Sequence, residues 1–186
     1  MSEEALAHIE NVLTDIQERL RRLEESARPA ERDPRKPAKG LLGFLDQFRA
    51  GEALGEASAG AWIEACRVDC LKGGLRTVQM REGMHAVLLE QRLKELGGSP
   101  RAEIPAADFE RAMADAASRE KSDAQKVKEF AARFRDPDEA IRPILEFADR
   151  LDEDPETQFL LRTIAQDERA TVAFFQEANA LLNPPS

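Results

Sequence analysis

Residues 75–96 and 161–182 of this chain repeat each other at a constant offset. The two stretches read LRTVQMREGMHAVLLEQRLKEL and LRTIAQDERATVAFFQEANALL, with Leu, Arg, Thr and Glu at matching positions. Both place apolar residues at alternating steps of three and four, which is the spacing of the buried stripe of a bundled helix. The repeat therefore predicts two similar helices that face a shared core in an all-α domain.

Polar residues interrupt both apolar stripes. The first stripe contains Leu75, Val78, Glu82, His85 and Leu89, and the second contains Leu161, Ile164, Glu168, Thr171 and Phe175. Burial of an unpaired carboxylate costs several kcal/mol, so a Glu at such a position needs a partner, a proton or a metal ion. The two helices are therefore predicted to carry a polar site.

A third helix, starting at Leu41, is also interrupted by a carboxylate. Its stripe contains Leu45, Phe48, Glu52, Gly55, Ala59, Trp62 and Cys66. The second repeat is preceded by a turn signal at Asp154–Pro155. If the first repeat has its turn at the matching position, this turn falls near Val68, and Glu52 then lies opposite Glu82. A turn at Gly73–Gly74 would bring Glu64 there instead, but Glu64 lies off the apolar stripe, so Glu52 is favoured.

A fourth helix is predicted over residues 137–153, with Asp136 as its N-cap, Pro137 at its first position and Glu139 in a capping box. Asp138 is the repeat counterpart of Glu52, although an acidic residue in a first turn also suits the helix dipole. Gly97 and Gly98 end the preceding repeat helix. The chain between Gly98 and Asp136 forms the crossover from the first repeat helix to the fourth helix. Helices at 105–119 and 121–135 are expected in this crossover, with apolar contacts from Phe109, Met113, Val127, Phe130 and Phe134.

Residues 1–25 form a separate amphipathic segment, which a Pro-rich linker at 26–40 joins to the main domain, residues 41–186. The segment has one narrow apolar stripe, made of Leu6, Ile9, Leu13, Ile16, Leu20 and Leu23. Such a helix cannot bury its stripe alone. It either forms a coiled coil with a second copy, which would make the protein a homo-oligomer, or packs on its own domain.

Composition excludes several classes of function. The net charge of -9 argues against nucleic-acid binding, which relies on Lys and Arg. No apolar run approaches the ~20 residues of a membrane span, and the N-terminus lacks a signal segment, so a cytoplasmic location is expected. Two cysteines are too few for a disulfide framework. Cys66 and Cys70 lie one helical turn apart, which is more typical of packing than of a redox pair.

The region from residue 41 to 182 resembles the ferritin-like superfamily, nearest to small rubrerythrin-like bacterial proteins. The resemblance rests on the hairpin layout and on Ala50-Gly51-Glu52, Glu82-Gly83-Met84-His85 and Leu93-Lys94-Glu95-Leu96-Gly97-Gly98. It implies an antiparallel four-helix bundle formed by residues 41–67, 70–97, 137–153 and 156–182, with extra helices in the crossover.

The resemblance also implies a metal site. In that family the Glu of the first helix binds one iron, the Glu of Glu-x-x-His bridges two irons, and its His completes the first; these roles fall on Glu52, Glu82 and His85. The second half supplies Asp138 and Glu168, but Thr171 replaces the last His. That change removes a nitrogen ligand from the second metal position. A single ion on Glu52, Glu82, His85 and Glu168 remains chemically reasonable.

Three functions stay open at this point. One is a ferritin-like bundle without metal that serves as a scaffold or interaction module. A second is an iron-binding oxidase, peroxidase or iron-handling protein with one or two ions. A third is a plain helical bundle whose internal acids pair with Arg76, Arg162 or Thr171. The missing His and the shortened Asp138 weaken the same half of the site, which favours the scaffold over an enzyme.

Overall fold

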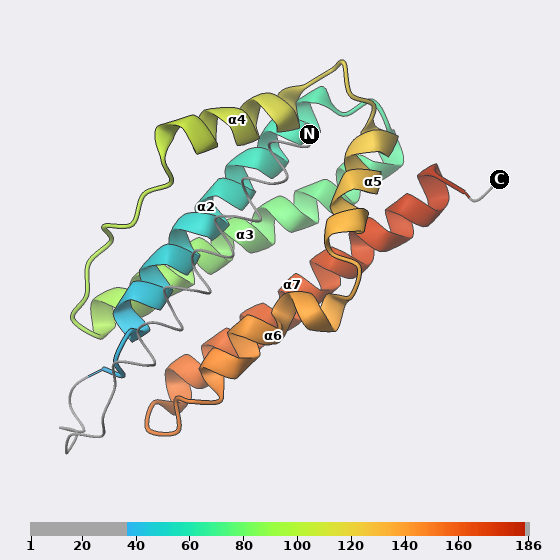
Figure 1. The fold of residues 1–186 in the computed structure, drawn as a ribbon. Coiled ribbons are helices and arrows are strands. Elements are labelled where there is room, and N and C mark those ends of the chain that lie inside the picture. Colours follow the sequence, from blue (N-terminus) through green and yellow to red (C-terminus); the bar gives the residue numbers. More distant parts are fainter. Residues whose placement is uncertain (1–36, 185–186) are drawn as a thin grey trace.

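The computed structural model describes residues 37–184, and this part of the chain contains six α-helices and no strand. The helices are α2 (Leu41–Ala65), α3 (Asp69–Glu95), α4 (Ala106–Ala117), α5 (Asp123–Arg133), α6 (Pro137–Ala148) and α7 (Pro155–Leu182). The prediction of an all-α fold is confirmed (Figure 1). The amphipathic segment at 1–25 and its proposed coiled coil lie outside the described residues.

The helices α2 and α3 form an antiparallel hairpin whose turn falls at residues 66–68, where the repeat predicted it. Gly73 and Gly74, the competing turn, lie inside α3. A side chain from α5 stabilises this turn, because Asp123 Oδ2 accepts from the backbone N–H groups of Arg67 and Val68 at 2.8 and 3.2 Å. The turn position brings Glu52 level with the middle of α3.

A second hairpin joins α6 to α7, and here the predicted end of the helix at Glu153 is wrong. The helix α6 ends at Ala148, because the chain turns there and buries Leu151 in the core. The carbonyl of Ala148 accepts from the N–H of Leu151 and from the Gln158 side chain, in place of a further helical turn. Asp154 then caps α7 by accepting from the Thr157 N–H at 3.0 Å.

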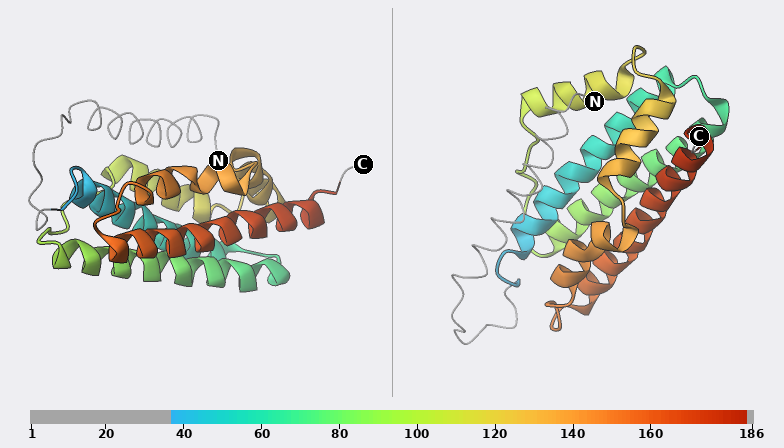
Figure 2. Two further views of the ribbon diagram at one scale, coloured as in Figure 1. Left: turned by 90° about the horizontal axis from the view of Figure 1, so that it is seen from below. Right: turned by 45° about the vertical axis from the view of Figure 1, so that its right-hand side comes forward.

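The predicted crossover helices are present as α4 and α5, but α5 does more than connect. It packs on α7 and lies end to end with α6, so the two short helices together cover the long α7 (Figure 2). The break between them follows Phe134. The Gln176 side chain on α7 donates to the carbonyls of Phe134 and Arg135 at 2.9 and 2.8 Å, which satisfies groups that the break leaves free.

The core consists of two apolar clusters separated along the helix axes. One contains Phe44, Leu45, Leu89, Leu93, Phe147, Leu161 and Ile164; the other contains Trp62, Leu71, Leu75, Val78, Val127 and Phe175. On α2, α3 and α7, the residues between these clusters are the polar ones that interrupt the stripes. The packing of α3 on α7 therefore brings the two halves of the polar site to one level.

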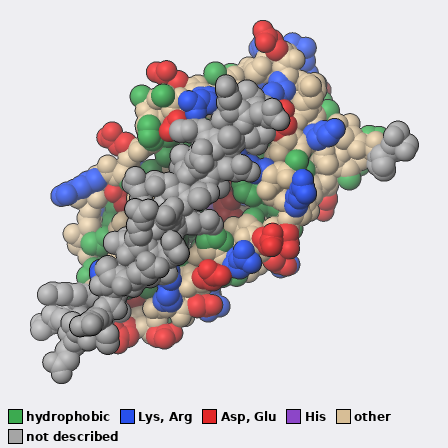
Figure 3. Space-filling model, in the orientation of Figure 1, with side chains coloured by type: hydrophobic (Ala, Val, Ile, Leu, Met, Phe, Trp, Pro, Cys, Tyr) green, Lys and Arg blue, Asp and Glu red, His purple; other side chains and the backbone are tan. Residues whose placement is uncertain are grey.

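Within residues 37–184, none of the helices is long and apolar enough to cross a membrane. The face seen in Figure 3 carries acidic and basic side chains that are interspersed with apolar ones.

Candidate metal centre

Three helices bring a Glu, a His and a second Glu together inside the domain. Glu52 comes from α2, His85 from α3 and Glu168 from α7. One ligand atom of each side chain lies within 4.8 Å of the other two, Glu52 and His85 are buried, and Glu168 is partly buried. Of the four residues predicted to share one site, Glu52, Glu82, His85 and Glu168, these three bring their ligand atoms together.

His85 lies among three carboxylates. Its Nδ1 is 2.9 Å from Glu52 Oε2 and 3.3 Å from Glu168 Oε1, and its Nε2 is 3.2 Å from Asp167 Oδ2. Burial by itself would lower the pKa of the imidazole, but the interactions with the carboxylates of Glu168, Glu52 and Asp167 outweigh burial and raise it to about 10. Without a metal ion, His85 is therefore an imidazolium at neutral pH.

Glu52 and Glu82 contact each other across the α2–α3 hairpin. Burial raises the pKa of Glu52 to about 7 and that of Glu82 to about 10, and the hydrogen bond between them favours the proton on Glu82. Gly55 provides the space, since a Cβ at this position would collide with Glu82 Oε2. The two carboxyl groups therefore share one proton, while Glu52 also pairs with His85.

Asp167 is a further residue of this polar group, and the apolar stripes of the sequence did not single it out. The structure places it against His85 Nε2 and 3.7 Å from Arg81 Nε. A signal was present, because Arg81 and Asp167 occupy equivalent positions of the repeat and carry opposite charges.

Asp138, the predicted fifth ligand, does not join this group. It is exposed in the first turn of α6 and pairs with Arg169, whose Nε lies 2.9 Å from Asp138 Oδ1. Its partner Arg169 directly follows Glu168 on α7, so Asp138 is engaged by an exposed cation and not by the Glu52, His85 and Glu168 group. The neighbouring Glu139 lines the cavity beside the site instead.

The predicted pairing of the internal acids with Arg76 or Arg162 is not observed. Arg162 donates to Asp149 at 2.6 Å, and Arg76 is exposed. Thr171 is buried, and its Oγ1 has no hydrogen-bond partner among the described residues; Glu168 Oε1, despite its contact with His85, has no directed hydrogen bond either. These oxygens mark the half of the site from which the second His is missing.

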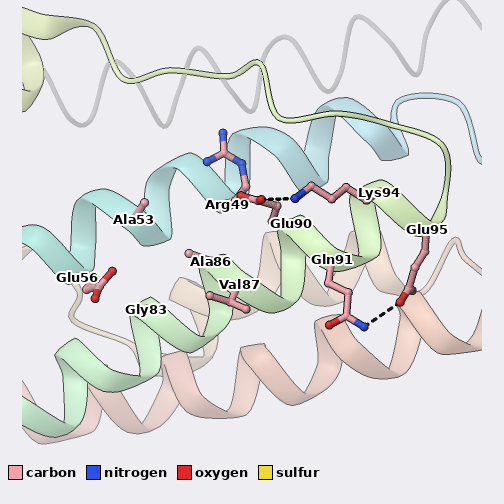
Figure 4. Close-up of a pocket in the computed structure, with 10 residues that line it drawn as sticks. All are labelled: Arg49, Ala53, Glu56, Gly83, Ala86, Val87, Glu90, Gln91, Lys94 and Glu95. Atoms are coloured by element: carbon pink, nitrogen blue, oxygen red, sulfur yellow. Dashed lines mark hydrogen bonds and ion pairs between the residues drawn. The ribbon is translucent and has the colours of Figure 1, made fainter.

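A cavity of about 650 Å³ adjoins the polar group. Glu52, Glu82, Glu168 and Thr171 belong to its lining. The rest of the lining is mainly aromatic and aliphatic, with charged side chains that include Lys126, Arg133 and Glu139. A separate groove of about 490 Å³ lies on the outer side of α2 and α3 (Figure 4). Lys94 pairs there with Glu90 at 2.5 Å, and the Gln91 side chain donates to Glu95 at 2.9 Å. Of these two cavities, the one of about 650 Å³ is the one that candidate ligands line.

Comparison of the chain with protein-family models, with curated proteins and with solved structures found no match. The donor atoms themselves are carboxylate oxygens and an imidazole nitrogen, a set that suits zinc, iron and manganese ions.

Proposed function

We propose that this chain is a ferritin-like four-helix bundle that binds a single divalent transition-metal ion. The ligands are Glu52, His85 and Glu168, and Glu82 is placed to add a further oxygen. The observation that carries the proposal is that one ligand atom from each of the first three side chains lies within 4.8 Å of the others. The paired hairpins and the repeat on α3 and α7 support the bundle.

Metal binding at this site must release protons. The imidazolium of His85 and the proton shared by Glu52 and Glu82 both occupy positions that an ion requires in deprotonated form. One nitrogen and two or three oxygens leave positions open on an ion, and the cavity lies beside them. Iron is the element that the family resemblance suggests, and a cytoplasmic location belongs to the same proposal.

A second ion is not part of the proposal. Thr171 offers no nitrogen, and Asp138 pairs with Arg169 outside the group. The paired-ion chemistry that activates dioxygen or peroxide therefore lacks half of its ligands, which argues against an oxidase or peroxidase.

A metal-free scaffold or interaction module is the second candidate, and one observation favours it. His85 already contacts three carboxylates, and Glu52 and Glu82 share a proton, so most of the cluster is satisfied without an ion. In this case the site is a hydrogen-bonded relic, and function resides on the surface, in a homo-oligomer or with another protein.

Metal analysis of protein purified without chelator separates the two candidates. We expect wild type and Asp138→Asn to carry one ion per chain, and His85→Ala to carry much less. Asp138→Asn is the matched control, because it removes a carboxylate that sequence alone assigned to the site. Equally little metal in wild type and His85→Ala would establish the scaffold instead.

Replacement of Thr171 tests whether the half of the site that lacks a His can contribute to metal binding. Thr171→His restores a nitrogen ligand beside Glu168 and should raise the metal content above that of wild type. Thr171→Val is the control, since the hydroxyl that it removes has no hydrogen-bond partner among the described residues and its loss should leave the metal content unchanged. If both variants carry the same amount of metal, position 171 does not face a metal position.

A further inference from the structure

An apolar groove runs along α2, between this helix and the row formed by α5 and α6. The close helix contacts are α2 with α3 and α4, α7 with α5 and α6, and α3 with α7. They leave the cavity of about 650 Å³ between α2 and the α5–α6 row. Its apolar lining includes Phe44, Phe48 and Trp62 from α2, Phe130 and Phe134 from α5, and Ile144 from α6.

The shape of this groove suits a helix. Phe44 and Trp62 lie at its two ends, and at 1.5 Å per residue they are about 27 Å apart along α2. Between them, Gly51 and Ser58 line the groove with little side-chain bulk, which lets another helix approach α2 closely.

The segment at residues 1–25 carries a narrow apolar stripe, and it lies outside the described residues. The stripe consists of Leu6, Ile9, Leu13, Ile16, Leu20 and Leu23, and a helix carrying it would span about 26 Å from first to last. This length matches the groove. A lone helix of this kind is unstable in water unless its stripe is buried.

The linker delivers the segment to the correct end of the groove. It ends at Gly40, directly before Leu41 and one turn from Phe44. Extended chain covers about 3.3 Å per residue, so residues 26–40 are long enough to reverse direction and lay the segment back along α2. Covalent attachment keeps the segment at a high effective concentration near this groove, which favours it over the same segment of a second copy.

We infer that residues 6–23 pack lengthwise in the groove between α2 and the α5–α6 row of their own chain. The docked segment buries its apolar stripe against the aromatic side chains that line the groove. This inference does not depend on whether a metal ion binds.

Trp62 provides the readout, because it is the only Trp in the chain and lines the groove. The test variant is full-length Leu13→Asp with Ile16→Asp, which places two charges on the stripe. The matched control is Asn11→Asp with Thr14→Asp, which adds the same charge off the stripe. With chelator present, we expect a red shift of Trp62 emission and stronger acrylamide quenching in the first variant only, with the solution mass of both equal to that of wild type.

Two results would overturn the inference. One is unchanged Trp62 emission and quenching in a Leu13→Asp, Ile16→Asp variant that circular dichroism shows to be folded. The other is a Trp62 change accompanied by a fall in solution mass, which would mean that a second copy supplies the segment. If the double Asp variant does not fold, Leu13→Ala with Ile16→Ala replaces it and should change Trp62 in the same direction by a smaller amount.

Discussion

At the scale of single residues, protons determine the state of the polar group. His85 holds a proton because three carboxylates surround it, and Glu82 holds one because it is buried against Glu52. These protons partly offset four acidic side chains, those of Glu52, Glu82, Asp167 and Glu168. An ion that displaces them supplies positive charge in their place, so the same residues can support both the metal-free and the metal-bound state.

The metal-free protein should lose stability as pH rises. The pKa of Glu82 is about 10 in the folded chain against an ordinary value of 4.5, so its protonated form is favoured by folding. Its stabilising contribution is complete below pH 4.5 and is lost as the pH rises to the folded pKa. His85 acts in the same direction, because its pKa rises from the ordinary value of 6.5 to about 10 in the folded chain. The free energy of unfolding should therefore fall from about pH 4.5 to about pH 10, and most steeply above about pH 6.5, where both groups contribute.

The variant Glu82→Gln measures how much of this pH dependence of stability comes from the Glu82 carboxyl group. The amide stays neutral at every pH, so the variant should lose less stability than wild type over this range when urea unfolding is measured with chelator present. Glu110→Gln on the exposed face of α4 makes the same charge change away from the site and should keep the wild-type slope. A Glu82→Gln slope equal to that of wild type would contradict the assigned proton.

At the scale of helices, the neighbouring residues Gly73 and Gly74 of α3 indicate how closely α3 and α7 approach each other. Gly74 faces α7, and a Cβ there would collide with the ring of Phe174, whereas a Cβ on Gly73 would meet nothing within 4 Å. Arg92 ties the other end of these helices together, with bonds to Thr157 at 2.7 Å and to Asp154 at 2.8 Å. The spacing of α3 and α7 sets the distance between His85 and Glu168.

Alanine at these two glycines should have opposite effects. Gly73→Ala should raise the free energy of unfolding by roughly 0.5–1 kcal/mol, because alanine is the better helix former and space is available. Gly74→Ala should lower it, since Phe174 has to leave its packed position. Urea unfolding of the two variants checks the pair. Equal stability of both would mean that α3 and α7 do not pack at this spacing.

At the scale of the whole molecule, the candidate site links both hairpins. Glu52 and His85 belong to the first hairpin and Glu168 to the second, so an ion bound to all three would hold the hairpins together. Such an ion binds only the folded chain, and at a concentration 100 times its Kd it would stabilise folding by about 2.7 kcal/mol.

Metal loading should therefore raise the melting temperature. For a chain of this size the expected shift is roughly 5–10 °C, measured by circular dichroism with the ion and then with chelator. Asp138→Asn should show the same shift as wild type, and His85→Ala should show little or none. A shift of equal size in His85→Ala would indicate that the ion binds elsewhere.

The sequence by itself determined the helices, the place of the first turn and the residues that face inward. A period of three and four residues fixes which side of a helix is buried, and polar residues on that side must find each other, so Glu52, His85 and Glu168 could be predicted to meet. The all-α fold follows from the same local pattern. The family resemblance itself stays a proposal.

Tertiary structure alone decided where helices end and which side chains meet across them. The helix α6 stops at Ala148 because Leu151 is buried, α5 joins the α6 row because Val127 and Phe130 pack on the Trp62–Phe175 cluster, and Asp167 rather than Asp138 reaches His85. These outcomes depend on the axial register between helices. Contacts between residues far apart in sequence fix that register, and a local period carries no information about it.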